Sequence, residues 1–340
     1  MLLILTNTGD ATASFLISIL KEQNIPFIRL DTDKLIPRIS LSYNSGVPTI
    51  KIDDVWHEPT VFDNLWYRRP EHLKDTRFDT SPESKYILSE WTEFLECFLA
   101  YVPKPRWVNH PSCNAMASHK LEQLTRAPTF DFKVPDTLVT QDKDALRAFF
   151  TKHHGQVIVK PVASGYVERS GEQMDSLIYT NRVHKFDLDN LDDLSACPAL
   201  FQEFIQKQYD VRITVVDAEI HAVAIFGTED DGTQRCDIRR DNMLHVRYEI
   251  IKLPLRIKAS VTKLMKHYGL RFAAIDMAVT RTDEWFFFEV NANGQWAWLD
   301  MCAGSKIAES FIKSFSQTHM GISGPHEPKI NVTKSPGLVL

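Results

Sequence analysis

The sequence has few cysteines, and their spacing fits neither a disulfide framework nor a zinc site. The five are odd in number and scattered, with no CxxC pair and no histidine at zinc-site intervals; they are Cys97, Cys113, Cys197, Cys236 and Cys302. Disulfide scaffolds and zinc sites depend on regular spacings of this kind. We therefore expect reduced thiols, mostly buried, in a cytoplasmic protein.

The sequence also lacks an excess of positive charge and any long apolar run. A formal net charge of -5 gives no global attraction to nucleic acid or to an anionic membrane. No stretch of eighteen apolar residues occurs, which argues against a transmembrane helix. The apolar start 1–5 is short and runs into the polar segment 6–10, which predicts a first β-strand and a turn in place of a signal peptide.

Two common nucleotide-binding motifs are absent as well. The chain contains neither Gly-x4-Gly-Lys-Ser/Thr nor Gly-x-Gly-x-x-Gly. The first motif cradles phosphates in P-loop proteins, and the second marks the dinucleotide-binding βαβ unit. Both of these nucleotide-binding classes therefore lose most of their support.

Two carboxylates and a carboxamide late in the chain carry the most information. Asp276 lies in the apolar run 273–280, and Glu289 and Asn291 lie in the aromatic-rich run 284–291. Both runs are short and rich in β-branched or aromatic residues, so they predict the two strands of one β-hairpin.

The position of the turn sets the register of this hairpin. A turn centred between Thr282 and Asp283 places Asp276 opposite Glu289, and Asn291 shares their face because side chains alternate along a strand. Like charges opposed at a Cβ spacing of about 5 Å destabilise a strand pair unless a cation lies between them. Oxygen ligands alone favour a hard cation such as Mg²⁺, with water and phosphate oxygens as its other ligands.

Two other interpretations of the hairpin stay open at this point. In one, the polar face is solvated and binds nothing; in the other, the register slips by one residue and separates the carboxylates. The first is the weaker, because the neighbours Ile275, Met277, Phe288 and Val290 are apolar and predict a core on the opposite face.

Three further segments contain residues suited to a nucleotide or an anion. Lys160 ends an apolar strand before a small-residue loop, where Ser164 and Gly165 let the backbone approach the same anion. The apolar strand 201–205 can sandwich a purine, with Asp210 just beyond it to accept ribose hydroxyls. Both segments also have an ordinary interpretation: Lys160 as a solvated lysine at a strand end, and 201–205 as a buried strand.

The third segment, 237–241, is polar and brings two arginines between strands. Arginine side chains suit carboxylates and phosphoryl oxygens because their donors form a fork. Taken alone, the segment is better explained as an exposed charged loop.

In series, these residues resemble the ATP-grasp ligases. The shared positions are Lys120, Lys160-Pro, Gln202-Glu-Phe-Ile205, Asp210-Val-Arg212, Asp276 and Glu289-Val-Asn291. A closer resemblance is to the microviridin-type branch, the graspetide synthetases that cross-link ribosomal peptides. It is carried by Thr8-Gly-Asp10, Phe27-Ile-Arg-Leu-Asp-Thr-Asp33, Trp66-Tyr-Arg-Arg69, Asp237-Ile-Arg239 and Glu289-Val-Asn-Ala-Asn-Gly-Gln-Trp296.

The resemblance implies an α/β (α+β) protein with the ATP-grasp fold and ATP held between two sheets. It implies an N-terminal α/β subdomain over 1–105, a central subdomain over 106–200, a C-terminal ATP-grasp subdomain over 201–325 and a tail over 326–340. The prolines at 103 and 105 support the first of these borders, because they end a helix.

The resemblance also assigns a role to each candidate residue. Asp276, Glu289 and Asn291 would hold Mg²⁺. The ATP-binding set would be Lys120, Lys160, Ser164, Gly165, Glu203, Phe204, Ile205 and Asp210. The set acting at the reaction and on the acidic peptide would be Arg212, Asp237 and Arg239. One departure is the run Glu-Val-Asn-Ala-Asn, where such enzymes usually have Asn-Pro-Asn; it keeps the ligands but changes the loop.

The implied function is ATP-dependent ligation of a ribosomal precursor peptide with a leader and an acidic core. An Asp or Glu side chain becomes an acyl phosphate, and Ser, Thr or Lys attacks it to close an ester or amide ring. Alternatives are a RimK-type ligase that adds an amino acid to a carboxylate, and a nucleotide-binding regulatory protein without turnover. Homodimers are common among such enzymes.

Overall fold

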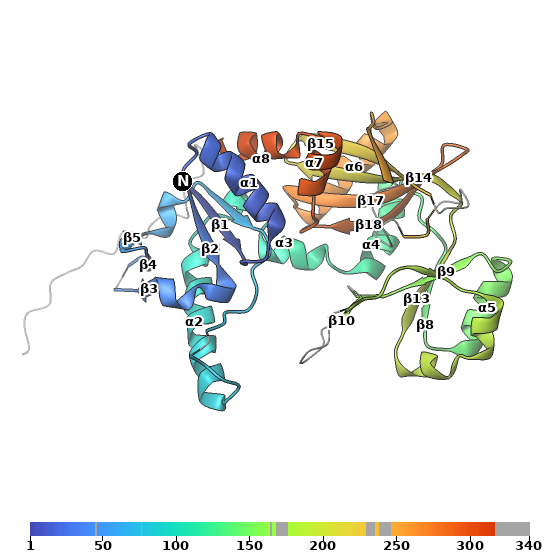
Figure 1. The fold of residues 1–340 in the computed structure, drawn as a ribbon, viewed down its shortest axis with the longest axis horizontal. Helices are drawn as coiled ribbons and strands as arrows, with labels where there is room; N and C mark the ends of the chain where they lie inside the picture. The colour runs from blue at the N-terminus through green and yellow to red at the C-terminus, as the bar shows by residue number, and fades with distance from the viewer. Residues whose placement is uncertain are drawn as a thin grey trace, which may run out of the picture.

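A computed structural model gives the fold of the chain (Figure 1). It describes residues 1–44, 46–75, 77–163, 165–167, 176–228, 235–237 and 246–316. Two of the predicted site residues, Ser164 and Arg239, lie outside the described residues.

The N-terminal subdomain is built on a parallel sheet with the strand order β2-β1-β6-β7. Its strands are β1 (Leu2–Thr6), β2 (Phe27–Asp31), β6 (Asn64–Tyr67) and β7 (Trp107–Val108). Every residue of β1 is buried, as expected for a parallel strand covered on both faces. Helices α1 (Ala11–Glu22) and α2 (Pro82–Ala100) accompany this sheet, together with the small antiparallel sheet of β3 (Ile39–Ser42), β4 (Thr49–Ile52) and β5 (Val55–His57).

The central subdomain is an antiparallel sheet with the order β12-β9-β13-β8. Its strands are β8 (Thr137–Thr140), β9 (Val157–Lys160), β12 (Asn181–Arg182) and β13 (Ala199–Glu203), and its helix is α5 (Lys143–Lys152). The short pair β10 (Tyr166–Val167) and β11 (Ser176–Leu177) extends from it, and α3 (Pro111–Met116) and α4 (Lys120–Arg126) precede it in the chain. The predicted border between residues 200 and 201 falls inside β13, which pairs with both β8 and β9.

The C-terminal subdomain is a five-stranded antiparallel sheet with the order β16-β15-β14-β17-β18. Its strands are β14 (Lys207–Val216), β15 (Glu219–Gly227), β16 (Val246–Ile250), β17 (Phe272–Thr280) and β18 (Trp285–Asn291). Helix α6 (Leu255–Tyr268) packs on one face, where alternate residues of β14 such as Val211 and Ile213 meet Val261 and Leu264. The helices after the hairpin, α7 (Ala297–Ala303) and α8 (Ile307–Ser316), were not predicted from the sequence.

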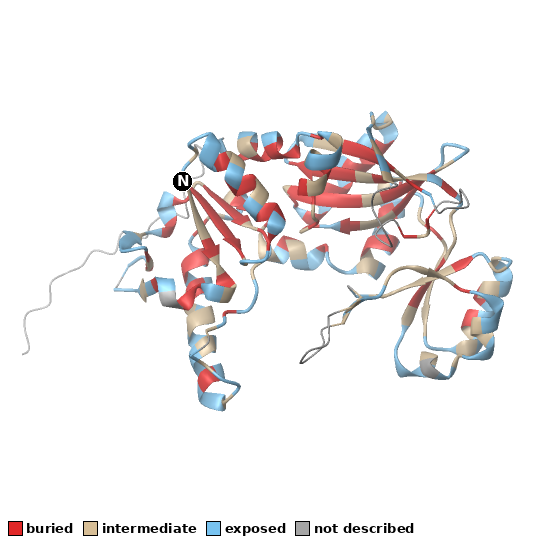
Figure 2. Cartoon of the chain, in the orientation of Figure 1, coloured by how far each residue is buried: buried red, intermediate tan, exposed pale blue. Residues whose placement is uncertain are grey.

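The N-terminal and C-terminal subdomains share one hydrophobic core. Leu2 and Trp66 from the first pack in the same buried cluster as Phe272, Trp296 and Phe311 from the second. The central subdomain has a separate and smaller core around residues such as Phe149 and Phe201. Figure 2 shows the same contrast, with buried residues dense in the five-stranded sheet and sparse around β8, β9 and β13.

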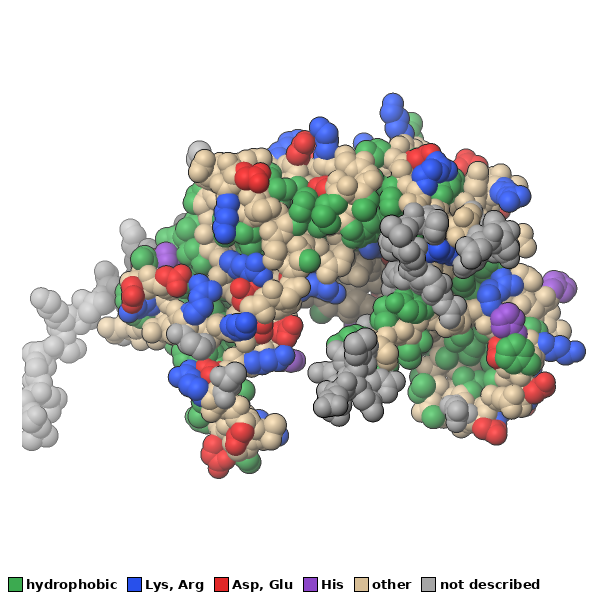
Figure 3. Space-filling model, viewed as in Figure 1, with side chains coloured by type: hydrophobic (Ala, Val, Ile, Leu, Met, Phe, Trp, Pro, Cys, Tyr) green, Lys and Arg blue, Asp and Glu red, His purple; other side chains and the backbone are tan. Residues whose placement is uncertain are grey.

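The described surface mixes charges of both signs. On the face shown in Figure 3, basic and acidic side chains are interspersed over all three subdomains. Within the described part of the chain, no helix is both long and apolar enough to span a bilayer.

Candidate active site

The predicted opposition of Asp276 and Glu289 is confirmed. They are Cα partners across β17 and β18, and Asn291 pairs with Ala274 further along. The predicted reason is only partly right, because a register shift follows Asp276: the next pairs are Met277 with Phe287 and Ala278 with Phe286.

Phe288 is the extra residue of this β-bulge, and it corrects one sequence-based expectation. The sequence predicts Phe288 on the core face, yet the buried aromatic residues of this strand are Trp285, Phe286 and Phe287, and Phe287 is fully enclosed. Phe288 is only half-buried, and the Lys160 ammonium lies 5.7 Å from the centre of its ring. The bulge therefore turns an aromatic side chain toward the strand end that carries Lys160.

Each of the two opposed carboxylates has a cation of the chain beside it. The Nη1 atom of Arg212, on the neighbouring strand β14, donates to both oxygens of Asp276 at 2.6 and 2.7 Å. The ammonium of Lys120, at the start of α4, lies 3.5 Å from Glu289 Oε2. These contacts supply the positive charge that the sequence argument required between opposed carboxylates.

The donor set fits a hard cation. Burial raises the pKa of Asp276, and the charges of Glu289 and Asp210 add to this rise, while Arg212 opposes it. A divalent cation would relieve the same repulsion. Among the described residues, no group of three or more His, Cys, Asp and Glu side chains could hold a metal ion. The predicted ligand set, two carboxylates and the Asn291 amide, is smaller than that. Such a set leaves ligand positions for water and phosphate.

Arg212 also has an unused donor. Its Nε is buried and has no hydrogen-bond partner in the part of the chain that the structure describes. A buried guanidinium nitrogen without a partner is costly, and an anionic ligand placed beside it would remove that cost. Arg212 thus suits a phosphoryl or carboxylate oxygen as well as Asp276.

Lys120 links the loop after β9 to the carboxylate pair. Besides its contact with Glu289, its ammonium donates to the backbone oxygens of Pro161 at 3.3 Å and Ala163 at 3.0 Å. Lys160 ends β9 as predicted, just before this loop. The two lysines of the predicted ATP-binding set therefore lie at the same loop.

Gly165 is required by the conformation of that loop. Its φ is +74°, and a Cβ atom there would lie 2.7 Å from both Ile178 O and Pro161 Cγ. Its carbonyl accepts a hydrogen bond of 2.9 Å from the Ile178 N–H. Only glycine adopts this positive φ and leaves room for Ile178 O and Pro161 Cγ without strain.

The end of β13 is tied to the start of the central sheet. The Glu203 N–H donates to Asp136 O at 3.0 Å, and Glu203 Oε1 accepts from the Asp136 N–H at 3.1 Å. His153 lies between their carboxylates, 2.8 Å from Asp136 Oδ2 and 3.8 Å from Glu203 Oε2. The Glu203 carboxylate is thus held by the central sheet, and the next residue, Phe204, has the Arg182 guanidinium 3.7 Å over its ring.

The remaining predicted residues follow along the chain. The Ile205 carbonyl accepts from the Lys207 N–H at 2.8 Å, and the Lys207 ammonium pairs with Asp210 at 2.8 Å. Burial raises the pKa of Asp210, against the effect of Lys207. Asp237 is buried and accepts a hydrogen bond of 3.2 Å from the Thr180 N–H.

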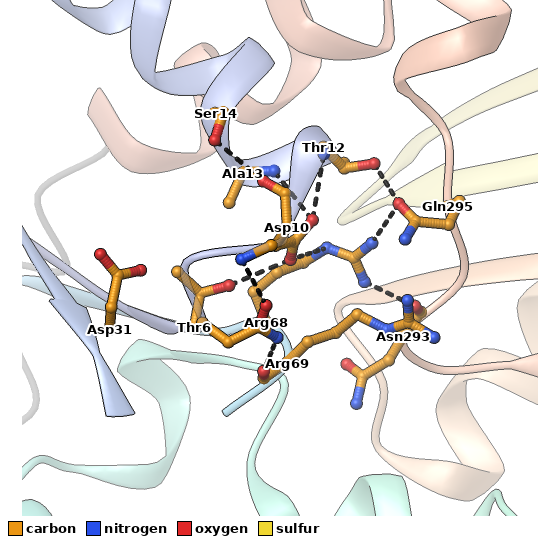
Figure 4. A network of polar contacts seen from close by, with 12 residues as sticks. Thr6, Asp10, Thr12, Ala13, Ser14, Asp31, Arg68, Arg69, Asn293 and Gln295 are labelled. Carbon is orange, nitrogen blue, oxygen red and sulfur yellow. Dashed lines mark hydrogen bonds and ion pairs between the residues drawn. The ribbon is translucent and has the colours of Figure 1, made fainter. Parts of the chain in front are cut away.

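A buried polar network that contacts the loop after the β17–β18 hairpin was not predicted as a unit. Arg68, on the segment after β6, is almost fully buried and lies 3.3 Å from the buried carboxylate of Asp10 (Figure 4). Its other nitrogens donate to the backbone of Asn293 and to Gln295 Oε1, in the loop that follows Asn291. Three motifs that the sequence presents far apart therefore meet in one place.

Comparison with known proteins gives one domain match and a series of structural likenesses. The ATP-grasp domain of the prokaryotic glutathione synthetases matches residues 122–289. No curated protein matches the chain.

The chain is similar to solved macrocyclases over nearly its whole length. It is 27% identical to macrocyclase MdnC from Microcystis aeruginosa MRC, solved with precursor peptide MdnA, covering 92% of this chain and 100% of that one with a TM-score of 0.77. For macrocyclase MdnB of the same organism the identity is 26%, the coverage 93% and 98%, and the TM-score 0.71.

The ATP-grasp ligase PsnB, solved with a minimal precursor, Mg and ADP, is 20% identical with a TM-score of 0.72, covering 92% of this chain and 97% of that one. At this identity the likeness concerns the fold. The domain match to residues 122–289, the carboxylate hairpin and the likeness to the two macrocyclases support an ATP- and Mg²⁺-dependent ligase of the graspetide type with the ATP-grasp fold.

Proposed function

We propose that this ligase activates Asp or Glu side chains of a ribosomal precursor peptide and closes them onto Ser, Thr or Lys as ester or amide rings. The observation that carries the proposal is the likeness to MdnC over 92% of the chain. This likeness includes the N-terminal subdomain, which lies outside the domain match to residues 122–289.

The chemistry explains why charge must be neutralised at this site. A carboxylate is a poor acyl donor at neutral pH, and ATP supplies the phosphoryl group that makes it reactive. Negative charge then spreads over the transferring group, and catalysis depends on positioning and on cations placed around it. Lys120, Lys160 and Arg212 are the described cations suited to this task, because they already lie at the loop after β9 and at the carboxylate pair.

We assign the metal to Asp276, Glu289 and Asn291, and the substrate carboxylate to Arg212, Asp237 and Arg239. The nucleotide would lie where the central and C-terminal sheets meet. Its phosphates would contact Lys120, Lys160, Ser164 and Gly165, and its base and ribose would contact Glu203, Phe204, Ile205 and Asp210. The side chain of Glu203 already contacts Asp136, so its backbone carbonyl is the group left for the base.

A mass measurement tests the proposal. The chain is incubated with ATP, Mg²⁺ and an acidic peptide encoded beside its gene, and the peptide mass is followed together with ADP release. Each cross-link should remove the mass of one water molecule. A gain of mass would favour a RimK-type ligase, and the absence of peptide-dependent ADP release would favour a regulatory protein without turnover; either result contradicts macrocyclisation.

The partner in this proposal is a leader-bearing precursor peptide with an acidic core. All five cysteines are unpaired, and free thiols fit the cytoplasm, where such a precursor is made. The expectation that they are mostly buried is wrong, because Cys97, Cys197 and Cys302 are exposed. A homodimer is the assembly that we expect from the resemblance, and its mass in solution is directly measurable.

A further inference from the structure

The strand that carries two of the proposed metal ligands is an edge strand. β18 is the last strand of the five-stranded sheet, so no strand within the described residues pairs with its outer side, where Lys133 forms an isolated bridge with Phe286. Unpaired backbone groups on a buried edge cost free energy unless another group satisfies them. The residue at issue is Val290, which lies between Glu289 and Asn291 and has a buried side chain.

A glutamine from outside the hairpin occupies that edge. Gln123 Oε1 accepts from the Val290 N–H at 2.8 Å, and Gln123 Nε2 donates to the Val290 carbonyl at 2.9 Å. The same Nε2 donates to Ala117 O at 2.6 Å, and the side chain is only 2% exposed. The amide thus makes both bonds that a neighbouring strand would make.

The helix that carries Gln123 holds this strand in two ways. Lys120 and Gln123 are three residues apart on α4 and therefore point to the same side of the helix. Lys120 contacts the Glu289 carboxylate, and Gln123 fixes the backbone of the next residue. Helix α4 therefore contacts both the Glu289 carboxylate and the backbone of Val290, the residue that follows it.

A second buried amide acts on the other side of Asn291. Asn109 Nδ2 donates to Ala292 O at 3.0 Å and to Phe272 O at 2.8 Å, and its Oδ1 accepts from the Phe272 N–H. Val290 and Ala292, the two residues that flank Asn291, are thus each held by a buried side chain from elsewhere in the chain.

We propose that Gln123 is a positioning residue for the Mg²⁺ ligands Glu289 and Asn291, with Asn109 in support. This inference rests on the proposed metal site. The amide fixes the backbone between the two ligands, so its loss lets both side chains shift at the ion. Groups that orient metal ligands in this way are worth about 10–100-fold in metal affinity or activity.

The test measures binding and needs no peptide. ADP binding is titrated by calorimetry with Mg²⁺ and with EDTA, and the ratio of the two affinities gives the gain due to the metal. In Gln123→Met, which keeps the length but makes no hydrogen bond, the gain should fall about 10–100-fold. ADP binding in EDTA should stay at the wild-type value.

Two further variants make the result decisive. Gln123→Glu keeps the acceptor for the Val290 N–H but loses the donor, so we expect a smaller loss of the metal-linked gain; it decides the matter if Gln123→Met does not fold. Asn64→Leu is the control, since Asn64 is also a buried amide that holds a backbone carbonyl, that of Phe315 at 3.1 Å, away from the hairpin. It should lower stability and leave the gain unchanged.

An unchanged gain in a folded Gln123 variant, or an equal loss in Asn64→Leu, overturns the positioning role while leaving the proposed function intact. A wild-type chain that binds ADP equally well with and without Mg²⁺ overturns the metal assignment and this inference together.

Discussion

At the scale of single residues, the site is a set of carboxylates that each lie beside a cation of the chain. Asp276 contacts Arg212, Glu289 lies beside Lys120, and Asp210 pairs with Lys207. Removing the charge of one carboxylate should therefore change cation binding at the site more than it changes the packing of the hydrophobic core. This separation makes the metal assignment testable by an isosteric change.

Glu289→Gln should abolish turnover and leave the fold nearly unchanged. The change keeps the size of the side chain and removes the charge at the ion, where a bound metal contributes several kcal/mol to charge stabilisation, so we expect a loss of about 100-fold or more. Peptide-dependent ADP release measures the loss, and thermal unfolding measures the fold. The control is Glu284→Gln on the same hairpin, whose exposed carboxylate pairs with Lys133. Full activity in Glu289→Gln would remove this residue from the metal site.

The raised pKa of Asp276 predicts how stability depends on pH. Burial and the charge of Glu289 raise this pKa above its ordinary value of 3.8. The folded chain then keeps a proton that the unfolded chain has already lost, so the free energy of unfolding should fall as the pH rises from 3.8 through the raised value. Urea unfolding at a series of pH values measures this fall. Asp276→Asn should remove the part that Asp276 contributes, and an identical pH profile in the variant would contradict the shift.

The residues of the site were predictable to different degrees. Asp276, Glu289 and Lys160 stand out because charged side chains within or at the end of apolar strands need an explanation. Gln123 gives no such signal, because a single glutamine in a short helix reads as a surface residue. Its role depends on which strand lies at the sheet edge, and that is fixed by the topology of the whole sheet.

At the scale of elements, the loop after β9 combines a required glycine with the predicted phosphate contacts. Gly165→Ala should weaken ATP binding, because the new Cβ meets Ile178 O and the left-handed conformation itself costs about 1–2 kcal/mol. Gly304→Ala is the matched control: its φ is +64°, and a Cβ there meets nothing within 4 Å. Both variants should lose stability because alanine is strained in the left-handed conformation, and only Gly165→Ala should change the ATP dissociation constant. Equal ATP affinity in the two variants would show that the conformation of the loop at Gly165 does not affect ATP binding.

The first strand, whose apolar run ends at a polar turn, was predicted well. The sequence predicts a strand at the apolar start 1–5 followed by a turn, and the structure has β1 over Leu2–Thr6 and a turn after it. The hairpin was predicted by its apolar runs, but its turn was misplaced by half a residue, and the bulge at Phe288 restored the register at Asp276. A bulge depends on packing on both faces of the sheet, which local sequence does not contain.

At the scale of the whole molecule, the N-terminal subdomain is part of the site's support. It shares a core with the C-terminal sheet, and Arg68 reaches from it to the loop after Asn291. Burial lowers the pKa of Arg68 to about 10, opposed by Asp10. Little water therefore reaches this ion pair, so water cannot solvate one charge when the other is removed.

Breaking this pair should destabilise the union of the two subdomains. Asp10→Asn keeps acceptors for the N-terminus of α1 but leaves the buried Arg68 charge uncompensated, so the free energy of unfolding should fall by about 3–5 kcal/mol. The double variant Asp10→Asn/Arg68→Met removes both charges and should recover part of this loss. A buried apolar side chain costs less free energy than a buried charge without a partner.

The control for this cycle is an exposed pair, Lys143 with Asp192 at 2.7 Å, where the Asp192 side chain is 98% exposed. Asp192→Asn should cost at most about 1 kcal/mol. Urea unfolding of the wild-type chain, Asp10→Asn, Arg68→Met, the double variant and Asp192→Asn measures all these differences. If Asp10→Asn costs no more than Asp192→Asn, or if the double variant is as unstable as the sum of its parts, the buried pair does not couple the subdomains. The loop after Asn291 must then be held by the shared apolar core and by its other polar contacts, such as that of Asn109 with the Ala292 carbonyl.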